Sequence, residues 1–383
     1  MEKAEVLDWL QEERASKLDE LWTRADNTRR QYVGDQVHLR GLIEISNHCV
    51  RSCGYCGLRA GHKELKRYRM SEEEILESAK VAAACGYGTV VMQAGEDYGI
   101  TREWLANIVR RIKAEIGLAV TLSLGERPDE DLITWKKAGA DRYLLRFETS
   151  DDELYRLIHP PRSGVVAPAS APAGRDAGAT PSGRIALLRT LTKIGYEAGS
   201  GVMVGIPGQT FESLANDILL FRELDLDMIG IGPYLSHPDT PLGTGEWTRK
   251  IPPQEQVPSN ELMVYKAVAL TRLACPEANI PSTTALATIN KKSGRELGLM
   301  RGANIVMPNV TPQKYRALYE IYPAKACITE DALACQECIK RRIRSIGRVP
   351  GTGPGGRKRA DGETGRRGDG EQQRRRDASQ TAP

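Results

Sequence analysis

The sequence LIEISNHCVRSCGYCGLR, residues 42–59, joins a short β-rich run to a loop that carries three cysteines. Residues 42–46 are typical of a buried strand, and Cys49, Cys53 and Cys56 follow with C-x3-C-x2-C spacing. Reactive residues directly after a strand are typical of the C-terminal rim of a parallel (β/α) barrel. This stretch therefore indicates both a fold and a metal-binding loop.

The rest of the chain repeats the same strand-then-helix order. The predicted strands are residues 42–46, 89–95, 119–125, 142–148, 201–207, 228–234, 282–289 and 303–309. Helix patterns between them cover residues 71–85, 101–116, 129–138, 184–194, 211–224 and 261–273. This alternation predicts an α/β fold with a closed (β/α)8 barrel of TIM type, and an open doubly wound sheet is the alternative.

The composition of successive segments predicts where the barrel begins and ends and where loops interrupt it. Residues 1–35 have a helical pattern and predict an N-terminal helical extension, and residues 36–343 form the predicted barrel. Segments rich in Pro and Gly predict loop insertions at 160–183 and 242–258. Residues 344–383 have no large apolar side chain after Val349, so burial cannot offset the entropy of ordering, and a disordered tail is expected.

The charge balance argues against a nucleic-acid partner. The 383 residues carry a formal net charge of +4, and the tail alone contains ten Arg or Lys and five Asp or Glu, which leaves a nearly neutral body. A basic tail without interleaved aromatics is more typical of a solvated extension than of an RNA-binding arm. The sequence has no apolar run of membrane-spanning length and no signal-peptide layout, so a cytoplasmic location with reduced cysteines is expected.

Three thiolates on one short loop can hold one metal centre. A structural zinc takes four ligands, and the loop supplies only three, with His48 and His62 as weak candidates for a fourth. A four-iron cluster held by three cysteines leaves one iron open to a substrate or cofactor. At a barrel rim, a 4Fe-4S cluster is favoured over a zinc site or free thiols.

The position and spacing of these cysteines resemble those of the radical S-adenosylmethionine (SAM) superfamily, in which the open iron binds the amino and carboxylate groups of SAM. The resemblance implies that Tyr55 lies against the adenine. The segment MQAGED, residues 92–97, is similar to the superfamily's Gly-Gly-Glu segment. By that likeness, Gly95 and Glu96 would meet the methionyl amino group.

A wider set of motifs resembles the FeFe-hydrogenase maturase HydE family, from about Arg40 to Arg342. The motifs include VTLSLGE, GADRYLLRFET, GSGVMVGIPGQT and DMIGIGPYLSHPDTPL. The likeness implies that Glu148 contacts the ribose side of SAM and that Arg184 contacts its carboxylate. It also implies a set of residues that line the internal substrate cavity, although inward-facing barrel filler explains each of them equally well. These residues are Arg146, Thr121, Met228, Thr283, Thr284 and Tyr322.

A second cysteine set, Cys327, Cys335 and Cys338, has C-x7-C-x2-C spacing near the end of the predicted barrel. Many members of the HydE family have this set, and the resemblance implies a possible second iron–sulfur cluster that activity does not require. From the spacing alone, zinc or no metal at all remains an equal alternative.

The resemblance also implies a reaction. Reductive cleavage of SAM would give a 5′-deoxyadenosyl radical that reacts with a small organometallic substrate, an Fe(II) carbonyl–cyanide–cysteine complex. The partners implied are a tyrosine lyase that makes this complex and a GTPase scaffold maturase. Arg146 would neutralise the anionic complex, and the threonines would donate hydrogen bonds to it. The alternatives are a lysine mutase like methylornithine synthase, and a non-catalytic iron–sulfur or zinc carrier.

Overall fold

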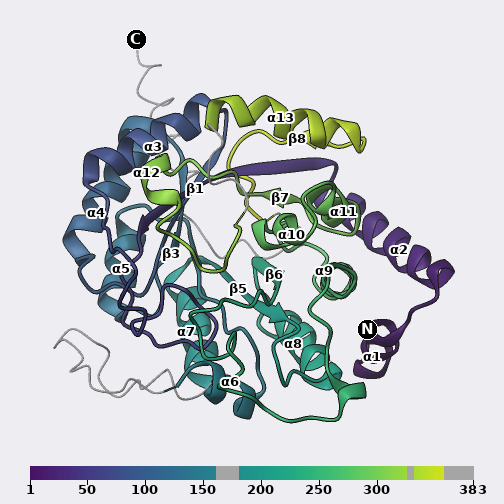
Figure 1. The fold of residues 1–383 in the computed structure, drawn as a ribbon. Coiled ribbons are helices and arrows are strands. Elements are labelled where there is room, and N and C mark those ends of the chain that lie inside the picture. The colour runs from purple at the N-terminus through teal and green to yellow at the C-terminus, as the bar shows by residue number, and fades with distance from the viewer. Residues whose placement is uncertain (161–180, 326–331, 358–383) are drawn as a thin grey trace.

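The computed structural model describes residues 1–160, 181–325 and 332–357, without the side chains of 332–335. Figure 1 shows a ring of helices around a central parallel sheet. The sheet has eight strands in the described residues, in the order β6-β5-β4-β3-β2-β1-β7, and β8 also pairs with β1. The strands are β1 (Gln36–Ser46), β2 (Thr89–Ala94), β3 (Ala119–Ser123), β4 (Arg142–Leu144), β5 (Glu197–Val204), β6 (Met228–Pro233), β7 (Ile305–Val306) and β8 (Val349–Pro350).

The predicted α/β fold is confirmed, as a partial (β/α) barrel of parallel strands. No direct ladder joins β6 to β7 among the described residues. Instead, Asn279 forms a parallel bridge with Met228, and Pro281 forms one with Ile305. A short extended segment therefore takes the place of a full strand and brings the ends of the sheet together.

Amphipathic helices surround the sheet and begin at the capping residues that the sequence offers. Ser71 forms a reciprocal capping box with Glu74 at the start of α3, and Thr210 caps α8. The helices that follow strands are α3 (Glu72–Ala84), α4 (Arg102–Arg111), α5 (Asp129–Lys137), α6 (Asp152–Ile158), α7 (Pro181–Ile194), α8 (Phe211–Glu223) and α9 (Glu261–Ala274). The remaining helical elements are a π turn (Ile112–Ile116), a 3-10 turn (Pro253–Glu255), α10 (Thr284–Ile289), α11 (Gly294–Met300), α12 (Gln313–Arg316) and α13 (Ala332–Ser345).

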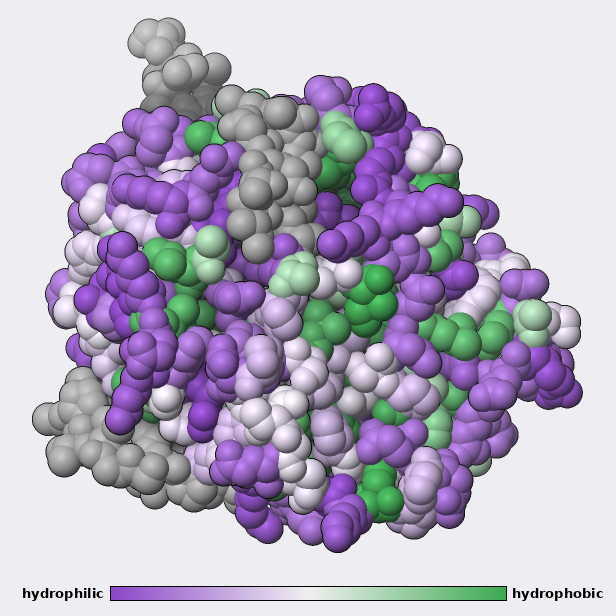
Figure 2. Space-filling view, in the orientation of Figure 1, coloured by the Kyte–Doolittle hydropathy of each residue, from purple (hydrophilic) through white to green (hydrophobic). Residues whose placement is uncertain are grey.

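The N-terminal extension is helical, as predicted. Helices α1 (Lys3–Gln11) and α2 (Ala15–Val33) pack against α8 and α9. Leu21 and Ala25 on α2 are buried, and Lys266 of α9 donates to the Leu10 carbonyl at 2.9 Å. No helix among the described residues is both long enough and apolar enough to span a bilayer. The face seen in Figure 2 is largely hydrophilic, with hydrophobic residues in small groups.

The predicted strand at residues 282–289 is wrong. The chain forms the short helix α10 there, and the Thr283 side chain caps it by accepting from the Leu286 N–H at 3.3 Å. The β-branched residues favoured a strand, but a threonine cap followed by Ala and Leu satisfies the free N–H groups of a helix start. The residues that close the barrel lie just before this helix.

The predicted boundaries of the tail and of the first insertion also change. Residues 344–357 are ordered, since α13 continues to Ser345 and β8 pairs with β1. Backbone hydrogen bonds and the buried Arg348 side chain hold this segment in place. The scarcity of apolar side chains therefore wrongly predicted disorder here. Residues 358–383 lie outside the described residues, as do 161–180, and α7 already begins at Pro181 inside the predicted insertion. Between residues 242 and 258 the chain forms turns and one 3-10 turn, and its being an insertion stays a prediction.

Candidate functional site: a cysteine-rimmed barrel cavity

One cavity of about 350 Å³ occupies the barrel and opens near the loop after β1. Cys49, Cys53 and Cys56 line it at that end. Arg40, in the first half of β1, and Met228, the first residue of β6, line it toward the N-terminal ends of the strands. A volume of this size is typical of a small-molecule site. The predicted metal loop and the predicted substrate cavity are therefore parts of one space.

The Cys49 sulfur is held by backbone donors. The N–H groups of Arg51 and Glu96 point to it at 3.5 and 3.4 Å. N–H donors of this kind stabilise negative charge on cluster-bound sulfur. Burial raises the pKa of the Cys49 thiol to about 12, so at neutral pH it loses its proton only when a metal replaces it.

Three thiolates can bind three irons of a four-iron cluster, whereas a structural zinc takes four ligands. Within residues 1–160, 181–325 and 332–357, no three Cys, His, Asp or Glu side chains come close enough together to bind one metal ion. Zinc would gather its thiolates around one point at about 2.3 Å each, whereas a four-iron cluster takes each thiolate on a separate iron. The weak fourth candidate His62 donates through Nδ1 to the Gly57 carbonyl at 2.8 Å.

The end of β2 lies directly against the cysteine loop. A Cβ on Gly95 would lie 2.3 Å from the His48 carbonyl oxygen, so only glycine fits at this position. The next residue, Glu96, accepts at its carbonyl from the Val50 N–H at 3.0 Å. Its carboxylate accepts from the Glu126 N–H at 3.1 Å. The structure therefore brings Gly95 and Glu96 beside Cys49, as the sequence predicted.

A Gly95→Ala variant tests this close approach. The added methyl group would push the cysteine loop away from β2, and overpacking of this kind costs roughly 1–3 kcal/mol, which corresponds to about a 5–150-fold loss in SAM affinity. SAM binding to the reconstituted protein measures the effect. Gly61→Ala is the matched control, because its Cβ would only touch the Arg59 side chain at 3.4 Å. Equal SAM affinity in the two variants would contradict the packing argument.

Glu148 has an unusual backbone and an unpaired buried oxygen. Its φ of 65° is left-handed, which is rare outside glycine. Its Oε2 has no hydrogen-bond partner in the part of the chain that the structure describes, although Arg146 Nε lies 3.4 Å away. Burial raises the pKa of this carboxyl group, and Arg146 and Arg184 partly oppose that shift. A buried acceptor that lines a cavity is suited to a ligand hydroxyl.

Arg184 lies in the same wall with its guanidinium already engaged. Its Nε donates to Glu126 at 2.8 Å, and its Nη1 donates to the Arg146 carbonyl at 2.7 Å. Arg51 lies 3.9 Å from Glu126 and 4.0 Å from Glu96. Arg51, Arg184 and Glu96 line this part of the cavity, so two cations and one carboxylate face it, which suits a ligand that carries both an ammonium and a carboxylate group.

Sequence reasoning missed Arg51, which lines the cavity, and also Glu126 and His159, which contact lining residues. Glu126 follows β3, so the rule that reactive residues follow strand ends could have found it. Arg51 lies within the cysteine loop itself. His159 has no such signal, because it lies after α6, and its Nε2 meets the Tyr55 hydroxyl at 2.9 Å. Tyr55 is thereby fixed at the cavity wall.

All six predicted cavity residues line this space, and their roles remain predictions. The Thr121 hydroxyl is buried without a hydrogen-bond partner among the residues that the structure places, so it is able to donate to a ligand. Met228 Sδ accepts from Arg40 at 3.0 Å, and Arg146 donates to the Val202 and Gly230 carbonyls. The lining residues are Arg146, Thr121, Met228, Thr283, Thr284 and Tyr322.

The second cysteine set stays a prediction. Cys338 is a free, partly buried cysteine on α13. Cys327 and the side chain of Cys335 lie outside the described residues.

Comparisons with known proteins agree with this geometry. Residues 43–221 match the Radical SAM superfamily. The chain is 46% identical over 342 residues to the [FeFe] hydrogenase maturase subunit HydE of Thermotoga maritima, covering 88% of this chain and 89% of the relative. It is 27% identical to 3-methylornithine synthase of Methanosarcina acetivorans, over 77% of this chain and 75% of the relative.

The fold also resembles a solved structure. The crystal structure of methylornithine synthase (PylB) superposes with a TM-score of 0.72 at 24% identity, covering 91% of this chain and 94% of the other. That likeness shows the shared fold alone. The identity to the Thermotoga protein along nearly the whole chain is decisive, and the chain belongs to the radical SAM superfamily and, within it, to the HydE family of [FeFe]-hydrogenase maturases.

Proposed function

We propose that this radical SAM enzyme binds its 4Fe-4S cluster through Cys49, Cys53 and Cys56, and acts on a small organometallic iron substrate during [FeFe]-hydrogenase maturation. The observation that carries the proposal is the convergence of three features on one cavity. The cysteine loop, the Gly95–Glu96 strand end and the unpaired Glu148 oxygen all line it. The cluster and SAM, when bound, supply the 5′-deoxyadenosyl radical.

The residues at the cavity mouth fit SAM. Arg51, Arg184 and Glu96 line this end of the cavity, and this mixed-charge wall can orient a methionyl group that carries both charges. Glu148 offers its unpaired oxygen to the ribose hydroxyls. Tyr55, fixed by its hydrogen bond to His159, offers a ring face to the adenine. Because these side chains are already held in place, they can orient SAM for the reaction at a small cost in entropy.

The deeper part of the cavity supports an anionic, hydrogen-bond-accepting substrate. Arg146 and Arg40 bring positive charge to it, and the Thr121 hydroxyl is available as a donor. These groups suit the Fe(II) carbonyl–cyanide–cysteine complex that the HydE family is expected to use. Walls of Leu42, Val91 and Ile305 keep water out, which limits the atoms that a radical can meet. A tyrosine lyase and a GTPase scaffold maturase are the proposed partners.

An in vitro maturation assay tests this function. The reconstituted, reduced protein should cleave SAM and should be required for hydrogenase activation in the presence of the two partner maturases. The lysine mutase is the second candidate, because 3-methylornithine synthase is a relative along most of this chain. Incubation with SAM and lysine should give no methylornithine. Methylornithine formation without hydrogenase activation would reverse the assignment.

A further inference from the structure

The C-terminal segment 349–357 crosses the end of the barrel opposite the cysteine loop. Its first part is β8, which pairs with the start of β1. The N–H groups of Val349 and Gly351 donate to the Asp35 and Val37 carbonyls at 3.1 and 2.8 Å. Figure 1 shows this segment running beside β1 and β7. The segment therefore begins as part of the sheet and then turns across its end.

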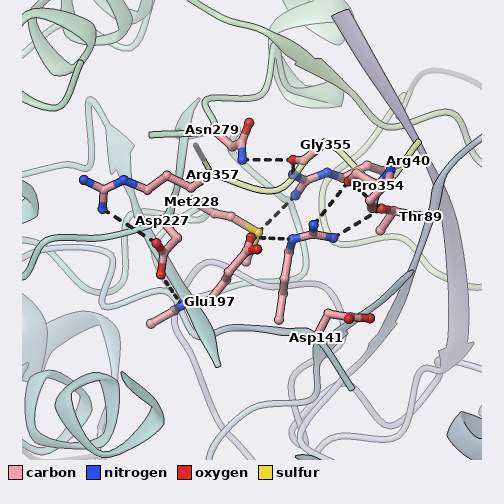
Figure 3. Close-up of polar contacts among 12 residues, drawn as sticks. Arg40, Thr89, Asp141, Glu197, Asp227, Met228, Asn279, Pro354, Gly355 and Arg357 are labelled. Atoms are coloured by element: carbon pink, nitrogen blue, oxygen red, sulfur yellow. Dashed lines mark hydrogen bonds and ion pairs between the residues drawn. The ribbon is translucent and has the colours of Figure 1, made fainter. Parts of the chain in front are cut away.

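The middle of the segment is held from several sides of the barrel. Pro354 offers its carbonyl to the Thr89 hydroxyl at 2.9 Å and to Arg142 at 3.2 Å. The Gly355 carbonyl accepts from Arg40 at 3.0 Å and from Asn279 at 3.1 Å. These contacts are visible in Figure 3. The donors belong to β1, β2, β4 and the segment that closes the sheet, so residues 354 and 355 lie across the opening rather than along one edge.

These carbonyls hold two buried guanidinium groups side by side. Arg40 and Arg142 are both buried, and Glu197 pairs with Arg142 at 2.7 Å. Burial, with repulsion from Arg142, lowers the pKa of Arg40 to about 9. Arg40 uses one Nη on Gly355 and the other on Met228 Sδ at 3.0 Å. Arg40 and Met228 line the cavity. Arg40 therefore lies between the segment and the cavity, and it contacts both.

Ion pairs hold the C-terminal end of the segment in place. Arg357 pairs with Asp225 at 2.6 Å, with Glu277 at 3.2 Å and with Asp227 at 3.6 Å. Asp225 and Asp227 lie directly before β6, which is the last strand at the other end of the ladder order from β1 and β7. The segment is thus fixed at both ends and spans the opening between them.

We propose that residues 349–357 are the floor of the reaction cavity, which excludes water from the end opposite the cluster and keeps Arg40 turned toward Met228. The proposal rests on the proposed function, because it treats the cavity as the reaction chamber. The segment acts on the reaction through Arg40 and through exclusion of water, so it is a positioning element and makes no contact with SAM. Without the segment, the protein should still cleave SAM, but the radical should no longer react efficiently with the substrate.

Two truncations test the floor. A chain that ends at Arg357 keeps the floor and should equal the full chain in SAM binding, SAM cleavage and hydrogenase activation. A chain that ends at Arg348 loses the floor and should still bind and cleave SAM. Its hydrogenase activation should fall by at least about tenfold, with 5′-deoxyadenosine released instead, because water and solutes reach the cavity. Full activation by the shorter chain would overturn the proposal.

A point variant tests the same idea in a full-length chain. A Cβ on Gly88 would lie 1.8 Å from the Gly353 carbonyl oxygen, and its nearest contacts all belong to the segment. Gly88→Ala should therefore displace residues 353 and 354 from the end of the barrel and reproduce the loss of hydrogenase activation. In the chain that ends at Arg348, the same substitution should have no further effect, since the clashing atoms are gone. An effect of equal size in both chains would show that Gly88 acts elsewhere.

Amide hydrogen exchange provides a readout that does not depend on activity. The Val349 and Gly351 amides should exchange slowly in the wild-type protein and much faster in Gly88→Ala. Fast exchange in the wild type would overturn the floor. If the wild type fails to cleave SAM at all, the proposed function falls, while slow exchange still shows that the segment closes the barrel.

Discussion

A Cys53→Ala variant is expected to lose reductive SAM cleavage completely, together with most of its bound iron. In the proposed cluster, three thiolates would hold three of the four irons, and removing one would leave a second iron without a protein ligand. The cluster then dissociates or can no longer position SAM. Iron content, the visible spectrum and 5′-deoxyadenosine yield measure the loss in anaerobically reconstituted protein.

Cys338→Ala is the matched control for this experiment. Cys338 lies on α13, is partly buried and does not line the cavity. This variant should cleave SAM as the wild type does. Tetrahedral zinc at Cys49, Cys53 and Cys56, with no iron spectrum that changes on SAM addition, would instead support the non-catalytic carrier.

An Arg146→Ala variant is expected to cleave SAM but to fail in hydrogenase activation. A hydrogen bond to a charged group contributes about 1.5–3 kcal/mol, so loss of the guanidinium should lower activation by roughly 10–150-fold. SAM cleavage should fall only slightly. The structure explains why it falls at all, because Arg146 lies 3.4 Å from Glu148 and opposes the upward pKa shift of that carboxyl group.

The conservative variant separates charge from packing. Arg146→Lys keeps a cation in the cavity and should recover part of the activation that Arg146→Ala loses. Hydrogenase activation and 5′-deoxyadenosine yield should be measured in parallel for both variants. Normal activation by Arg146→Ala would remove this residue from the substrate site, and equal loss of cleavage and activation would assign it to SAM instead.

The sequence was most informative where the chemistry is local. Cys49, Cys53 and Cys56 lie within eight residues, and the strand before them predicts where the loop emerges. Gly95 and Glu96 follow the next strand, and parallel strands bring their C-terminal ends to the same edge. Their proximity to the cysteine loop was therefore predictable.

Errors arose where local preference and tertiary context disagree. Residues 282–289 contain β-branched residues, yet Thr283 caps a helix and the barrel closes through Asn279 and Pro281. Residues 350–357 have no large apolar side chain, yet the carbonyls of Pro354 and Gly355 accept hydrogen bonds from buried arginines. Hydropathy does not report such donors, because they lie hundreds of residues away in the chain.

The sequence by itself determined the parallel α/β architecture and the position of the cysteine loop after the first predicted strand. These depend on short-range periodicity and on residues that follow strand ends. Only the tertiary structure decided which carboxylates remain unpaired, how the sheet closes between β6 and β7, and what covers the end opposite the cysteines. The physical reason is that buried polar groups pair with residues distant in the sequence. The local sequence pattern does not identify those partners.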